Sequence, residues 1–117
     1  MRQVRLARGA VNDIRRILIH SEAEFGAATR ARYKALLDQA MRDLAEDPAR
    51  FGVRPIPDLR PGYFVYHLKW SKPRAPGPAV GRPRHLLVFS VDAPGDVVLA
   101  AVVHERELLE RHLDQQP

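Results

Sequence analysis

The segment from Arg60 to Arg84 carries six basic residues and no acidic one. Guanidinium and ammonium groups attract polyanions such as DNA and RNA, and also acidic protein surfaces. His67, His85 and His104 lie in or near the same part of the chain, and imidazoles exchange protons near neutral pH. We therefore interpret this region as a functional face. Its candidate target-binding residues are Lys69, Lys72, Arg74, Arg82, Arg84, His104 and Arg106.

Other interpretations of these residues remain open. The net charge is +5, and sixteen of the nineteen basic residues are arginine, a bias that codon usage and solubility could explain. His104 could have a structural role, bonding a backbone group while Arg106 pairs with Glu105 or Glu110. Trp70 could stack on a base or anchor an interface, but its place in the alternation of the preceding strand favours the core.

The composition excludes several classes of protein. Cysteine is absent, which rules out disulfides, thiolate zinc sites and cysteine nucleophiles. The five histidines have no spacing typical of a metal site, so we expect no metal and no other cofactor. The chain has 117 residues, of which 45% are apolar, and should fold as a single domain over residues 1–117. It contains no membrane-length apolar stretch and no signal-peptide pattern, so we expect a cytoplasmic protein.

Two amphipathic helices are predicted in the first half of the chain. Apolar residues recur at intervals of three and four between Ala10 and Phe25, with charged residues on the opposite face. The same period continues from Ala27 to Glu46. Gly26, between the two, suits a left-handed cap. The helices should therefore form a hairpin whose apolar stripes need another layer beneath them.

That layer is predicted to be an antiparallel sheet. A short apolar run at residues 4–7 is typical of an N-terminal strand, and further strands are predicted at residues 63–70, 85–91 and 97–103. A short helix is predicted at residues 105–113. The fold class is therefore α+β: an N-terminal strand and a helical hairpin packed on an antiparallel sheet, in the order β-α-α-β-β-β, with a short C-terminal helix.

Two connections and one strand add to this outline. Residues 47–62 hold four prolines and two glycines and should form a surface connection. Residues 71–83 are also rich in Pro and Gly, which predicts an exposed, mobile loop. The strand at residues 97–103 is apolar on both faces. Because the hairpin can cover only one face of the sheet and the C-terminal helix is short, we expect a partner to cover the rest.

Local motifs accompany these elements. They are Ala10-x-x-Asp13-Ile14-x-x-Ile17, Ala31-x-Tyr33, Leu44-Ala45-Glu46-Asp47-Pro48, Leu59-Arg60-Pro61-Gly62-Tyr63, Arg84-His85 with Val88-Phe89, Val103-His104-x-Arg106 and Arg111-His112-Leu113. In their order and spacing, over nearly the whole chain, the sequence resembles the ParE branch of the ParE/RelE toxins of bacterial toxin-antitoxin pairs. It departs from the family in the length of the loop at residues 71–83 and in Ser90, where a Tyr is common.

The resemblance implies a toxin that inhibits DNA gyrase and traps its cleaved DNA complex. It also implies a small ParD-like antitoxin, encoded beside the toxin, that wraps and neutralises it. Proteins of this branch are not enzymes of known chemistry. An antitoxin segment lying on the hairpin and sheet would cover the apolar face left open above. The residues expected to contact it are Ile14, Ile17, Leu37, Met41, Tyr66, Leu87, Phe89 and Leu99.

Two alternatives stay open. The RelE branch cleaves mRNA in the ribosome, which requires cations at the scissile phosphate and a general acid or base near the sugar hydroxyl. The basic residues and the three histidines could supply both, although a proline-rich loop positions catalytic groups poorly. The chain could also be a decayed toxin that only binds its antitoxin.

Overall fold

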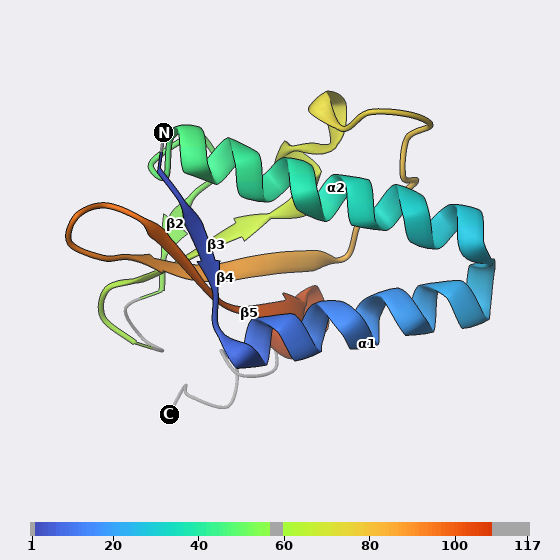
Figure 1. Ribbon diagram of the computed structural model, residues 1–117, viewed down its shortest axis with the longest axis horizontal. Coiled ribbons are helices and arrows are strands. Elements are labelled where there is room, and N and C mark those ends of the chain that lie inside the picture. Colours follow the sequence, from blue (N-terminus) through green and yellow to red (C-terminus); the bar gives the residue numbers. More distant parts are fainter. Residues whose placement is uncertain (1, 57–59, 109–117) are drawn as a thin grey trace.

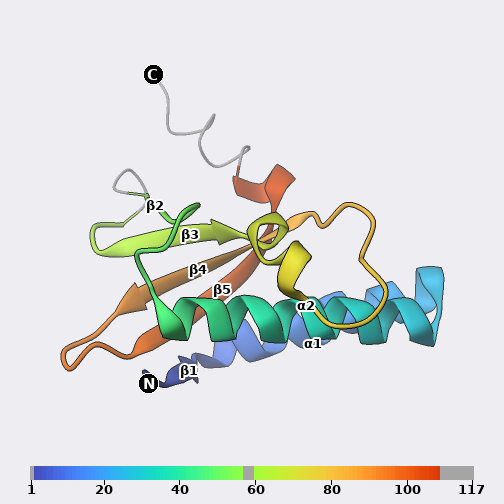
Figure 2. The same cartoon turned by 90° about the horizontal axis from the view of Figure 1, so that it is seen from above.

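The chain has the α+β fold that its sequence predicts (Figure 1). The computed structural model describes residues 2–56 and 60–108. Two helices lie side by side along one face of a five-stranded sheet (Figures 1 and 2). Of the helices within these ranges, none has the length and apolar character needed to cross a membrane.

The helical hairpin has nearly the bounds that its apolar period predicts. Helix α1 spans Arg8–Phe25 and helix α2 spans Ala27–Glu46. They are joined at Gly26, whose φ of 93° lies in the region that glycine adopts most readily. The Gly26 amide donates a hydrogen bond to the carbonyl of Glu22 and so ends α1. The turn therefore depends on a glycine at this position.

The sheet is mixed, with strand order β1-β5-β4-β3-β2. The predicted antiparallel meander is confirmed for β3, β4 and β5, while β1 joins β5 in the parallel direction. Strand β2 was not predicted, because two residues that include a proline carry no strand pattern. The bounds are β1 Val4–Leu6, β2 Arg54–Pro55, β3 Tyr63–His67, β4 His85–Val91 and β5 Val97–His104.

The hydrophobic core lies between the hairpin and one face of the sheet. Five of the residues predicted to contact the antitoxin belong to this core and are at most 1% exposed: Leu37, Tyr66, Leu87, Phe89 and Leu99. This burial corrects the prediction for these five, because a side chain enclosed by its own fold is not available to a partner.

The other three residues predicted to contact the antitoxin are Ile14, Ile17 and Met41. They are only half-buried, and they pack against the edge of the same core. Of the predicted set, these three therefore keep some surface that a partner could reach.

The strand predicted at residues 63–70 ends early, at His67. Ring atom Nδ1 of His67 accepts a hydrogen bond of 3.0 Å from the amide of Lys69, and this cap begins a short 3-10 helix at Leu68–Trp70. A helical turn breaks the alternation of a strand. Trp70 consequently leaves the core face and is 37% exposed, which corrects the prediction of a core position.

The connection before β3 is built around Gly52 and Trp70. Gly52 has a φ of 100°, and a Cβ at this position would lie 2.5 Å from the indole ring of Trp70. Phe51 packs edge-on against the same indole, with ring centroids 4.9 Å apart. The missing side chain at Gly52 thus lets the indole lie directly against the backbone.

The loop at residues 71–83 is tied to the domain more closely than its composition predicts. Ser71 is buried, and its hydroxyl donates a hydrogen bond of 2.6 Å to the buried carboxylate of Asp43 in α2. Arg74, in a second 3-10 helix at Lys72–Arg74, lies 3.1 Å from the same carboxylate. Further along, Val80 packs against the core. The loop is exposed for most of its length, but it is anchored.

The second face of the sheet carries a smaller apolar cluster. Val65, Leu86 and Val103 are buried there, with Ile56 and Leu108 packed against them. Residues 105–108 begin the predicted C-terminal helix, and its remainder, to residue 113, lies outside the described residues. The chain itself therefore covers part of the face that we expected a partner to cover.

We expect Asp43→Ala to destabilise the fold by about 3 kcal/mol or more. The carboxylate accepts from Ser71 and pairs with Arg50 at 2.8 Å, so its loss leaves a guanidinium without its balancing anion. Urea unfolding followed by circular dichroism measures the change. Asp38→Ala is the control, because Asp38 pairs with Lys34 on the exposed side of the same helix and should cost less than about 1 kcal/mol. Equal losses in both variants would contradict this role for Asp43.

Gly52→Ala should destabilise the fold by about 2 kcal/mol or more, since its backbone conformation strains any residue with a Cβ, and that Cβ would collide with Trp70. Gly81→Ala is the matched control, because a Cβ at Gly81 would meet no atom within 4 Å, and its effect should stay under about 1 kcal/mol in either direction. Thermal unfolding measures both. Wild-type stability in the Gly52 variant would show that the indole does not rest on this backbone.

Candidate functional site

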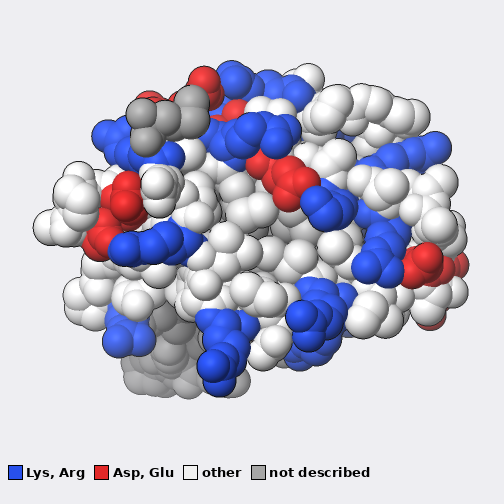
Figure 3. Space-filling model, viewed as in Figure 1, with Lys and Arg blue, Asp and Glu red and all other residues white. Residues whose placement is uncertain are grey.

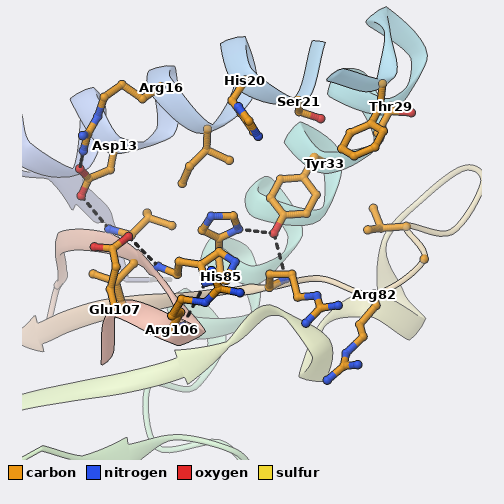
Figure 4. A pocket seen from close by; sticks show the side chains of 18 of the residues that line it. Asp13, Arg16, His20, Ser21, Thr29, Tyr33, Arg82, His85, Arg106 and Glu107 are labelled. Carbon is orange, nitrogen blue, oxygen red and sulfur yellow. Dashed lines mark hydrogen bonds and ion pairs between the residues drawn. The ribbon is translucent and has the colours of Figure 1, made fainter. Parts of the chain in front are cut away.

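A groove opens between the two helices, the start of β4 and the end of β5. Its volume is about 1170 Å³, and it is lined by α1, the start of α2, the end of the loop and the end of β5. In Figure 4, His20 points from α1 toward Tyr33 and His85. We name it the basic groove because arginines and histidines outnumber carboxylates in its lining. Its charged and titratable members are Arg16, Arg82, Arg84, Arg106, His20, His85, His104, Asp13 and Glu107.

A buried tyrosine fixes the imidazole of His85 in this groove. The Tyr33 hydroxyl accepts the amide N–H of Arg84 at 3.3 Å and forms a hydrogen bond of 2.6 Å with Nδ1 of His85. Burial lowers the pKa of His85 to about 4 and raises the pKa of Tyr33 to about 12. Both groups are therefore uncharged at neutral pH.

His104 and His67 use the same ring nitrogen at the ends of their strands. Nδ1 of His104 accepts the amide of Arg106 at 3.0 Å, just as Nδ1 of His67 accepts the amide of Lys69 at 3.0 Å. A backbone amide keeps its proton, so each of these nitrogens acts as an acceptor. The structural role considered for His104 is thus present, with an amide as its partner. His104 also lines the groove, with its ring edge-on to that of His85 at 5.2 Å.

Glu105 links His67 with Arg84. Its carboxylate lies 2.7 Å from Nε2 of His67 and 3.9 Å from the guanidinium of Arg84. The hydrogen bond with His67 lowers the pKa of Glu105. The Arg84 side chain nevertheless remains 49% exposed, so it can contact a ligand at the rim of the groove.

Two carboxylates close the free edge of β5. Strand β1 pairs only with the first part of β5, and the remaining backbone faces α1. Asp13 of α1 accepts the amide of Val102 at 3.0 Å, and Glu107 accepts the amide of His104 at 3.3 Å. Asp13 also pairs with Arg16. The acidic groups of the groove therefore bind donors of the protein itself, and they protect the strand edge from pairing with another chain.

The structure brings four of the seven predicted target-binding residues together. Arg82, Arg84, His104 and Arg106 all line the basic groove. They come from the end of the loop, the residue before β4, the end of β5 and the start of the C-terminal helix. Of the seven predicted residues, only these four therefore lie together around the groove.

The other three predicted residues do not line the groove. Lys69 lies over the indole of Trp70, with Nζ 4.9 Å from a ring centroid. Lys72 donates to the carbonyl of Gly81 within the loop. Arg74 pairs with Asp43 and with Glu46 of α2. Lys72 and Arg74 therefore help to hold the loop in place, a role that the sequence did not predict.

Sequence reasoning missed the part of the groove that the hairpin supplies. Asp13, Arg16 and His20 lie on one side of α1, and Tyr33 contacts His85 from 52 positions away in the chain. The spacing of the three polar residues at intervals of three and four, beside Ile17, was a signal that could have been used. No local pattern could have paired Tyr33 with His85.

Basic side chains do not cover the face shown in Figure 3. They lie there in several groups, with uncharged and acidic side chains between the groups. The overall charge of +5 therefore does not mark a polyanion-binding face by itself, and the local grouping of arginines in the basic groove carries more weight.

The fold and the groove together define a small α+β protein with a basic groove at one end of its sheet. In a comparison with protein families, the model of the ParE toxin of type II toxin-antitoxin systems, parDE, matches residues 4–109. The chain belongs to this family and is thus a toxin that pairs with an antitoxin. No curated protein matches it significantly.

Stability should fall as the pH drops from about 6.5 toward 4. The pKa of His85 is about 4 in the folded chain and about 6.5 when unfolded, so the unfolded chain binds more protons in this window. Between pH 7 and pH 4.5, His85→Gln should remove about 2 kcal/mol of the loss seen in the wild type. Urea unfolding at the two pH values measures it. His20→Gln, at an exposed position of α1, should keep the wild-type loss, and an unchanged loss in the His85 variant would refute the assignment.

Proposed function

We propose that this toxin inhibits DNA gyrase by binding it stoichiometrically and that a small ParD-like antitoxin neutralises it. The observation that carries the proposal is the convergence of Arg82, Arg84 and Arg106 on one groove. All three side chains are exposed in part or in full, which suits contact with an acidic protein surface or with DNA in the gyrase complex. Since gyrase acts on bacterial DNA, the proposal implies a cytoplasmic site of action.

The hydrogen bonding of the histidines supports binding rather than catalysis. A general base needs a ring nitrogen free to take a proton from the substrate. Nδ1 already accepts a backbone amide in His67 and His104, and Nδ1 of His85 is bonded to the Tyr33 hydroxyl. The pKa of His85, about 4, is also far below the value near neutrality that suits an acid or base. We therefore propose that the toxin is not a ribonuclease.

Neutralisation is proposed to work by competition. An antitoxin segment that lies across the hairpin and the end of the sheet would cover the basic groove and exclude the target from its arginines. Ile17, one of the half-buried residues predicted to contact the antitoxin, lines this groove beside Arg16. Antitoxin and target would then share a surface, which is enough to explain neutralisation without a conformational change.

The first test is DNA supercoiling by gyrase in the presence of the purified chain, scored for linear, cleaved DNA. Cleaved DNA that accumulates and then disappears on adding the antitoxin encoded beside the toxin would support the proposal. No inhibition by a chain that circular dichroism shows to be folded would contradict it. Cleaved mRNA in a translation extract would then favour a RelE-like endonuclease, and no effect in either assay would favour a decayed toxin.

Reversing the charge of Arg84 and Arg106 together should abolish toxicity in cells and gyrase inhibition in the supercoiling assay. Placing carboxylates at the rim replaces attraction by repulsion, which costs several kcal/mol in charged interfaces. The Arg15→Glu/Arg32→Glu double variant is the matched control, because it changes the net charge equally at two exposed positions of the hairpin. It should remain inhibitory. Full inhibition by a folded Arg84→Glu/Arg106→Glu variant would exclude the groove rim as the target-binding site.

A further inference from the structure

Two aromatic side chains are exposed together, close to the end of β3. Phe51 is 79% exposed, more than any other large apolar side chain in residues 2–56 and 60–108, and Trp70 is 37% exposed. Their rings pack edge to face, with centroids 4.9 Å apart. Nζ of Lys69 lies over the indole, 4.9 Å from a ring centroid. We name Phe51, Lys69 and Trp70 the aromatic patch.

The backbone is shaped to hold this patch at the surface. The cap formed by Nδ1 of His67 ends β3 and begins a helical turn, so Trp70 leaves the alternation that would bury it. Gly52, with a φ of 100°, leaves space for the indole against the backbone. Aromatic rings gain more from burial than most side chains, yet the chain exposes part of its single tryptophan. Grouped exposure of this kind is typical of an interaction surface.

The segments that supply the patch are basic. Residues 48–56, which supply Phe51, contain two arginines and no acidic residue. Residues 60–84, which supply Lys69 and Trp70, contain six basic residues and no acidic one. The Lys69 side chain is exposed. The patch therefore suits a partner that offers an apolar pocket with carboxylates around it.

A series of contacts connects the patch with the rim of the basic groove. The guanidinium of Arg84, at the rim, lies 3.9 Å from the carboxylate of Glu105. The same carboxylate lies 2.7 Å from Nε2 of His67, whose Nδ1 accepts the amide of Lys69 at 3.0 Å. One imidazole thus bonds the rim on one side and the backbone of the patch on the other. The two are neighbouring parts of the surface, so one partner can contact both.

The patch favours a protein partner over a nucleic acid. A stacked base needs a free ring face. The backbone of Gly52 and the side chain of Lys69 both lie against the indole of Trp70, so they occupy ring surface that a base would need. Phe51 stands mostly in solvent. An aromatic side chain that fills an apolar pocket is a common anchor of protein interfaces.

We infer that the aromatic patch is a second contact with gyrase, in which Phe51 and the exposed part of Trp70 enter an apolar pocket and Lys69 pairs with a carboxylate at its edge. The inference rests on the proposed inhibition of gyrase, and it adds a surface outside the basic groove. Because the patch does not line the groove, an antitoxin segment in the groove leaves it open. Changes in the patch should therefore weaken target binding more than antitoxin binding.

The supercoiling assay with purified gyrase tests this inference through the concentration of chain that gives half-maximal inhibition. Phe51→Ala should raise this concentration by about tenfold, because it removes the anchor of the contact. The variant should fold, since the side chain is mostly in solvent. Ile19→Ala is the matched control, because Ile19 is 53% exposed on α1 and does not line the groove. It should stay within about twofold of the wild type.

A charge reversal tests the patch independently. Lys69→Glu should also raise the concentration for half-maximal inhibition by about tenfold, because it places a carboxylate against an acidic partner. Arg15→Glu changes the net charge in the same direction at an exposed position of α1 and should stay within about twofold. Calorimetric titration with the antitoxin encoded beside the toxin should give both patch variants an affinity within about twofold of the wild type.

The possible results separate the inference from the proposed function. Wild-type inhibition by the folded patch variants would overturn the inference and leave the gyrase proposal and the groove rim standing. An equal loss of antitoxin binding in these variants would also overturn it, since the patch would not be specific to the target. A folded wild-type chain that does not inhibit gyrase would overturn both.

Nucleic-acid binding has its own readout, because Trp70 is the only tryptophan of the chain and its fluorescence reports on the patch. Quenching of this fluorescence by a short single-stranded oligonucleotide, lost in Phe51→Ala, would assign the patch to nucleic acid and overturn the inference alone. Unchanged fluorescence, together with weaker gyrase inhibition by the two patch variants, is the result expected for a protein contact.

Discussion

A single buried carboxylate connects the parts of this domain that are far apart in the sequence. Asp43 of α2 lies 2.8 Å from Arg50 in the following connection and 2.6 Å from the hydroxyl of Ser71 in the loop. Ser71 in turn bonds the hydroxyl of Tyr66, in the sheet, at 2.8 Å. An ionised group is costly to bury unless cations and hydrogen-bond donors surround it. The helix, the connection, the loop and the sheet must therefore assemble together around this residue.

The ends of the strands are set by a second recurring device. β3 and β5 each end at a histidine, His67 or His104, whose Nδ1 accepts the amide two residues later and starts a helical turn. The same turn carries Arg106 into the basic groove. The His104 cap that ends β5 therefore also helps to place Arg106 in the groove. The imidazoles of His67 and His104, which the sequence offers as candidate acids and bases, bond backbone amides at the ends of these strands.

The size of the domain limits where a partner can be recognised. A chain of 117 residues needs most of its large apolar side chains for its own core, and the hairpin and sheet bury Leu37, Phe89 and Leu99 between them. At the margin of that core, half-buried Ile17 and exposed Phe25 line the same groove as the arginines. Under the proposed function, target and antitoxin would share this surface.

The sequence by itself determined both helices, the meander and the family resemblance, because periodicity and turn residues are local properties. It also placed Arg82, Arg84, His104 and Arg106 in one candidate set. Only the tertiary structure decided that Lys72 and Arg74 tether the loop and that Trp70 leaves the core. The tertiary structure also decided that the Tyr33 hydroxyl bonds the ring of His85, which lies 52 positions later in the chain. These features depend on contacts between distant segments and on the face that each strand turns inward, which no local pattern specifies.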